Sequence, residues 1–62
     1  MELKKQLLTA RTLLGLSRED AADKIGCSRE SYKSYELGRR SIERANKAIQ
    51  RNINEMIREA KL

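Results

Sequence analysis

The chain contains 62 residues, with 14 lysines and arginines against 9 acidic residues, one cysteine and no histidine, and its net charge is +5. A chain this short predicts one domain with a small core, and its single cysteine excludes an internal disulfide. Without histidine it also lacks a zinc-ligand set, so we expect no metal and no cofactor. The positive charge favours a polyanionic partner, nucleic acid before an anionic membrane surface, and no stretch approaches the ~20 apolar residues of a membrane span.

The first predicted helix covers residues 2–14. Its apolar positions recur at helical spacing and form a single stripe, made by Leu3, Leu7, Ala10 and Leu14. Gly15 ends this helix, and Leu16 is expected to fold back onto the core.

Two short helices are predicted next, over residues 18–25 and 29–37, joined by a tight turn. Each follows a serine that can act as N-cap and precedes a glycine, which accommodates the left-handed backbone of a helix end. These capping residues are Ser17, Gly26, Ser28 and Gly38.

The second short helix has a polar outward face. Small residues at Ala21 and Ala22 let the two helices cross closely. The outward face of the second helix points away from this crossing and can meet another molecule. Its side chains are Arg29, Glu30, Ser31, Lys33 and Ser34. A polar helix that follows a tight turn is typical of a helix-turn-helix whose second helix enters the DNA major groove.

Residues 7–49 resemble the helix-turn-helix region of the Cro/cI-type repressors, the family that includes the xenobiotic-response-element regulators. The alanine and glycine of that motif correspond to Ala22 and Gly26, and its apolar positions correspond to Ala21, Ile25, Tyr32 and Tyr35. The flanks match too, at Arg11, Gly15-Leu16-Ser17 and Glu36-Leu37-Gly38. Arg18 departs from the motif, since members often have glutamine there.

The resemblance implies an all-α, lambda-repressor-like bundle of four or five helices with a helix-turn-helix and a long C-terminal helix. It also implies that Arg11 and Glu36 form a partly buried ion pair. On the residues alone, two independent surface charges are the alternative.

One long C-terminal helix is predicted over residues 42–61, after an N-cap at Ser41. No proline or glycine interrupts its helical spacing, and a break near Asn52 and Asn54 is the alternative. Its second half extends beyond the motif, so its apolar side chains need another surface, either the first helix or another copy of the chain. We expect a homodimer contact at Ile53, Met56 and Ile57, with Leu37 and the turn after residue 37 as the alternative.

The positive charge is concentrated in the helix over residues 29–37 and the turn after it. Phosphate contacts supply most non-specific affinity for DNA and make it dependent on salt. The candidates are Arg18, Ser28, Arg39 and Arg40, with Arg44 and Lys47 as weaker ones.

Base reading is assigned to the polar face of residues 29–37. The Arg29 guanidinium can bind guanine O6 and N7 together, and Glu30 can accept from cytosine N4 or simply stabilise the helix start. Ser31, Lys33 and Ser34 can contact bases or phosphates. The two tyrosines are expected in the core with their phenol oxygens at the surface, and Cys27 is expected to be a packing residue.

No catalytic constellation is present in the sequence, so we expect no enzyme. The pattern predicts a sequence-specific regulator, a Cro-like repressor that binds a pseudo-palindromic operator as a homodimer in the cytoplasm, without a membrane or small-molecule partner. Two alternatives remain: an antitoxin that regulates its own synthesis through DNA, and a helical adaptor that binds protein. The adaptor is disfavoured because the outward face of residues 29–37 is polar and basic, whereas protein-binding faces carry apolar anchors.

Overall fold

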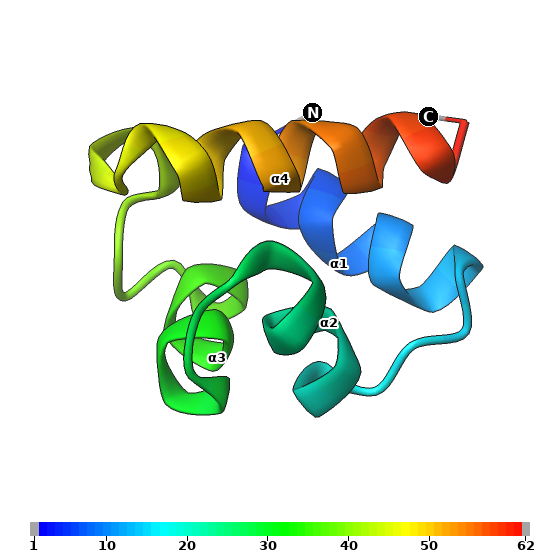
Figure 1. Cartoon of the computed structure of the whole chain (residues 1–62), viewed down its shortest axis with the longest axis horizontal. Coiled ribbons are helices and arrows are strands. Elements are labelled where there is room, and N and C mark those ends of the chain that lie inside the picture. Colours follow the sequence, from blue (N-terminus) through cyan, green and yellow to red (C-terminus); the bar gives the residue numbers. More distant parts are fainter. Residues whose placement is uncertain (1, 62) are drawn as a thin grey trace.

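The computed structural model describes residues 2–61, which form four α-helices and one short 3₁₀ helix, with no strand among them. The elements are α1 (Leu3–Leu13), α2 (Arg18–Ile25), α3 (Arg29–Leu37), η1 (Ile42–Arg44) and α4 (Lys47–Glu59). Figure 1 shows α4 along one side of the molecule next to α1, with α2 and α3 on the other side. The predicted all-α helix-turn-helix bundle is therefore confirmed.

Local signals set the limits of α2 and α3, which coincide with the ranges expected from the sequence. The hydroxyls of Ser17 and Ser28 accept hydrogen bonds from the backbone nitrogens of Asp20 and Ser31, at 3.0 and 3.1 Å. These bonds satisfy donors that a helix start leaves without a partner. Both helices end at a glycine with positive φ, at Gly26 and Gly38.

The core lies where α1, α2, α3 and α4 meet. Its largest fully buried side chains are Leu7, Ile25, Tyr32, Ile53 and Met56. Ala21 and Ala22 of α2 are buried, and α2 packs against both α3 and α4. Tyr35 is also buried, so both tyrosines belong to the core. The expectation that both phenol oxygens reach the surface is wrong for Tyr32, because the whole side chain, including its hydroxyl, is enclosed.

The single helix predicted over residues 42–61 is wrong, because the chain leaves helical geometry at Ala45 and Asn46. Both residues have extended backbone, and they separate η1 from α4. The Asn46 side chain accepts a hydrogen bond from the Ile49 backbone nitrogen at 2.9 Å and so starts a new helix. Asparagine competes for backbone hydrogen bonds in this way, which makes it a better cap than an interior residue.

The alternative of a break near Asn52 and Asn54 is wrong as well, because both residues lie within α4. The side-chain nitrogen of Asn52 instead donates to the Ile25 carbonyl oxygen at 3.1 Å. This bond ties the middle of α4 to the last residue of α2.

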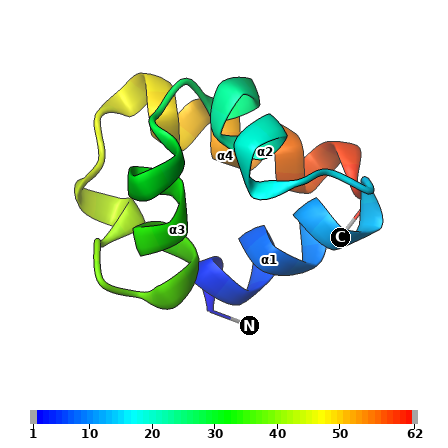
Figure 2. The ribbon, with the colours of Figure 1, turned by 90° about the horizontal axis from the view of Figure 1, so that it is seen from below.

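The dimer contact predicted at Ile53 and Met56 is also wrong, since both residues have an exposed fraction of 0% in the single chain. Figures 1 and 2 show α4 running beside α1, and the buried core includes residues from both helices. The first helix therefore supplies the surface that these side chains required. Ile57 is partly buried against the same core.

Candidate nucleic-acid interface

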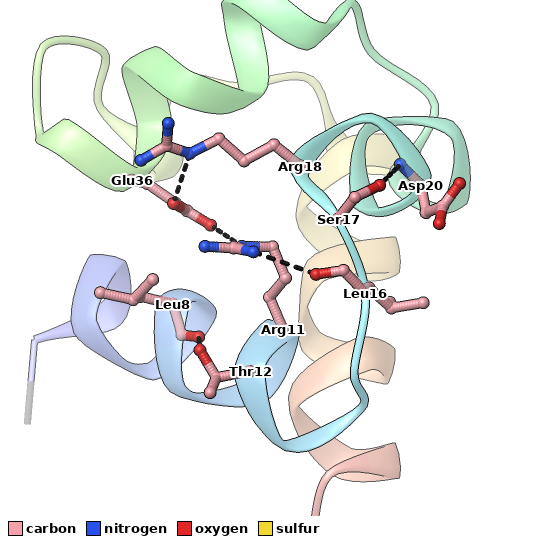
Figure 3. A network of polar contacts seen from close by, with 8 residues as sticks. All are labelled: Leu8, Arg11, Thr12, Leu16, Ser17, Arg18, Asp20 and Glu36. Carbon is pink, nitrogen blue, oxygen red and sulfur yellow. Dashed lines mark hydrogen bonds and ion pairs between the residues drawn. The ribbon is translucent and has the colours of Figure 1, made fainter.

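A buried carboxylate joins three helices at the centre of the site. The Glu36 side chain, near the end of α3, is only 2% exposed. Its Oε2 accepts from Arg11 Nε of α1 at 2.6 Å, and its Oε1 accepts from Arg18 Nε of α2 at 3.3 Å (Figure 3). Arg11 also donates through Nη1 to the Leu16 carbonyl oxygen at 3.0 Å. The ion pair expected between Arg11 and Glu36 is present, and Arg18 is a second cationic partner.

The electrostatics of this network favour the ionised carboxylate. Burial opposes ionisation, but the neighbouring Tyr32 hydroxyl and the guanidinium groups of Arg11 and Arg18 outweigh it, so the pKa of Glu36 lies below its usual value. Burial, followed by the nearby carboxylate of Glu36, raises the pKa of Tyr32, which therefore stays protonated. The Tyr32 hydroxyl lies near the carboxylate, yet within residues 2–61 it finds no hydrogen-bond partner with suitable geometry.

Arg18 combines a structural contact with an accessible end. It is the first residue of α2, and its side chain is 42% exposed. In Figure 3 the guanidinium turns its Nε towards Glu36, and one of its two terminal nitrogens lies on the side away from the carboxylate. Sequence reasoning proposed Arg18 for phosphate and missed its contact with Glu36.

A second polar cluster lies at the start of α3. The Ser28 hydroxyl donates to Ser31 Oγ at 3.0 Å, and Arg40 donates to the same Ser31 oxygen through Nη1 at 3.2 Å. Arg40, which follows the helix, therefore reaches back to its first turn. Burial raises the pKa of the nearby Cys27 thiol against the opposing charge of Arg40, so the thiol stays protonated.

The remaining candidates for base and phosphate contact differ in exposure. Arg29, Glu30 and Lys33 are exposed on α3, whereas Ser31 and Ser34 are partly buried. The Ser34 carbonyl oxygen accepts from the backbone nitrogens of Arg39 and Arg40, at 2.9 and 3.2 Å, so the turn folds back onto α3. Exposed cationic side chains follow in that turn, at the end of η1 and at the start of α4, namely Arg39, Arg40, Arg44 and Lys47.

Within residues 2–61, acidic and cysteine side chains do not gather in groups of three or more that could hold a metal ion. The helices described for the same residues are too short or too polar to cross a membrane.

Two short helices joined by a tight turn, with a capped and polar second helix, define a helix-turn-helix protein. The chain matches the family model described as helix-turn-helix over residues 7–47, more than half of its length. It therefore belongs to that family, the Cro/cI-type or xenobiotic-response-element regulators, and is a DNA-binding transcriptional regulator of this type. Searches of curated proteins and of solved structures returned no match.

Proposed function

We propose that the chain is a sequence-specific repressor of the Cro type, which binds a pseudo-palindromic operator as a homodimer and covers promoter DNA. The observation that carries this proposal is the row of exposed polar residues along α3, Arg29, Glu30 and Lys33, whose opposite face is buried in the core. A helix held in this way can enter the major groove as a rigid unit.

Base reading and phosphate binding fall to different residues in this proposal. Arg29 is the first residue of α3, the end that meets base edges in this docking mode, and its guanidinium matches the two acceptors of guanine. Arg39 and Arg40 follow the helix and are suited to phosphate, as are Arg18 and Arg44. Ser28 and Ser31 lie at the start of α3, and their hydroxyls bond to each other. In this proposal they contribute to DNA binding through that position.

The dimer contact in this proposal is assigned to Leu37 and the turn after α3. Leu37 is 46% exposed at the end of α3, where a large apolar side chain is costly to leave in water. We expect Leu37→Ser to weaken self-association in sedimentation experiments without unfolding the chain. Leu13→Ser is the matched control, since Leu13 is also exposed but lies at the end of α1. Equal association of both variants would contradict this assignment.

The proposal is tested by selecting bound duplexes from a random pool. The expected result is a preferred site with two related half-sites. Arg29→Ala should then cost about 1–3 kcal/mol on that site and less on random DNA, because it removes a base contact. Arg39→Ala should weaken both equally and reduce the salt slope by about one unit.

Arg58→Ala is the control for these variants, because Arg58 is exposed near the end of α4, and that end of the helix lies on the opposite side of the ribbon from α3 in Figures 1 and 2. It should leave affinity for the selected site nearly unchanged. No enriched sequence in the selection would contradict specific recognition. Loss of base preference in Arg39→Ala but not in Arg29→Ala would show that α3 is docked in the wrong direction.

A further inference from the structure

Glu36 holds Arg18 in one orientation although it is itself enclosed. Its carboxylate is 2% exposed, so it cannot touch DNA, whereas the Arg18 side chain is 42% exposed at the first turn of α2. The contact uses Nε of the guanidinium, at 3.3 Å from Glu36 Oε1. One of the two terminal nitrogens points away from the carboxylate (Figure 3).

This geometry suits a guanidinium that binds two partners at once. Arginine presents five donors in a planar fork, so one edge can hold a carboxylate while the other meets a phosphate. A free arginine side chain has to give up rotamer entropy when it is fixed by a phosphate. Arg18 is already held by Glu36, so part of that ordering is complete before DNA arrives.

We propose that Glu36 is a positioning residue for a contact between Arg18 and a DNA phosphate, so that a buried carboxylate increases affinity for DNA. The inference rests on the proposed binding mode, in which α2 lies against the DNA backbone. Glu36 acts through Arg18 and not through its own charge.

The net charge alone predicts that removing the Glu36 carboxylate strengthens DNA binding, whereas the positioning role predicts that it weakens binding. Removal of a carboxylate raises the net charge of the protein by one, which favours association with a polyanion. Glu36→Gln should nevertheless weaken binding, because it releases the Arg18 guanidinium. Glu43→Gln is the matched control, since Glu43 is an exposed glutamate whose carboxylate accepts from the Ser41 hydroxyl and not from an arginine. This control should bind equally well or slightly more tightly.

The experiment measures affinity for a duplex of random sequence by fluorescence anisotropy across a range of potassium chloride concentrations. Arg18→Ala should lower affinity about eightfold at 0.1 M salt and reduce the salt slope by about 0.9, the value of one phosphate contact. Glu36→Gln should lower the affinity by most of that roughly eightfold factor. The double variant that combines Arg18→Ala with Glu36→Gln should bind no more weakly than Arg18→Ala, because both changes remove the same contact.

Glu36→Gln removes the ion pair with Arg11 and can therefore unfold the chain. Arg18→Lys leaves that ion pair in place and serves as a second test. Arg18→Lys preserves the charge but lacks the planar fork, so it should not restore the affinity of the unaltered chain. Circular dichroism at the assay temperature establishes that each variant is folded. If Glu36→Gln is unfolded, the result for Arg18→Lys decides, and full affinity in that variant overturns the proposal.

The outcomes separate this inference from the proposed function. If the unaltered chain binds DNA and Arg18→Ala is weakened, but Glu36→Gln binds as well as Glu43→Gln, the positioning role is overturned and the function stands. Additive losses in the double variant overturn it in the same way. If the unaltered chain does not bind duplex DNA at all, the proposed function and this inference both fail.

Discussion

The ion pair between Arg11 and Glu36 should contribute strongly to stability, and the two partners should contribute unequally. The atoms are 2.6 Å apart, and the side chains are 18% and 2% exposed, which places the pair much nearer a buried than a surface pair. Breaking a buried pair costs about 3–5 kcal/mol, whereas an exposed pair contributes about 1 kcal/mol or less.

We expect Arg11→Met to cost about 3 kcal/mol, because it leaves an enclosed carboxylate with only the longer contact to Arg18. Methionine keeps most of the apolar volume of the arginine side chain. Glu36→Gln should cost less, about 2 kcal/mol, because both arginines can turn towards water. The double variant should be more stable than the sum of the two losses predicts.

The assay is urea denaturation followed by the helical circular dichroism signal, with the midpoint and slope compared across the four proteins. A domain of 62 residues has a free energy of unfolding of about 3–9 kcal/mol, so the measurements belong at low temperature. A coupling free energy between Arg11 and Glu36 below about 0.5 kcal/mol would refute the reasoning. So would a larger loss of unfolding free energy for Glu36→Gln than for Arg11→Met.

Three further predictions concern single groups. The pKa of Glu36 in the folded chain lies below its ordinary value of 4.5. The contribution of its ionised form to stability is therefore complete above pH 4.5 and is lost as the pH falls through the lower folded-state pKa. In an acid titration, Glu36→Gln should lose less stability than the unaltered chain. Tyr32→Phe should change stability by less than about 1 kcal/mol in urea denaturation, because it removes a buried hydroxyl without a suitable hydrogen-bond partner and, at the same time, a neighbour that favours the ionised Glu36; a loss above that size would show that the hydroxyl does bond to Glu36. Asn46→Ala should cost about 1 kcal/mol and reduce helical signal, because it removes the N-cap of α4, and an unchanged midpoint would contradict this.

The helix-turn-helix was predictable because its signals are local. Serine caps and glycine ends fix α2 and α3 within a few residues of the chain, and small side chains mark the crossing. The start of α4 was not found because asparagine occurs at residues 46, 52 and 54, and the pattern alone does not show which one is a cap. Packing decides, since Asn52 bonds to the end of α2 while Asn46 faces the first turn of its own helix.

The candidate site was predictable only in part. The pair of Arg11 and Glu36 followed from the resemblance, but the contacts of Glu36 with Arg18 and of Ser31 with Arg40 did not. Such contacts depend on how helices cross and on where a turn folds back, which spacing along the chain does not reveal. In the same way, the apolar pattern of α4 indicated a face to be covered, and only the arrangement of α1 showed what covers it.

The two faces of α3 have different freedom to change during evolution. Tyr32, Tyr35 and Glu36 are buried and hold the helix in the bundle, whereas Arg29, Glu30 and Lys33 are exposed. Exposed substitutions of this kind usually alter stability by no more than about 0.5 kcal/mol. In the proposed binding mode, a lineage can therefore exchange the exposed residues one at a time and acquire a new operator preference while the scaffold stays intact. By the same reasoning, the chain is a suitable starting point for retargeting, with the three exposed positions randomised and the buried face retained.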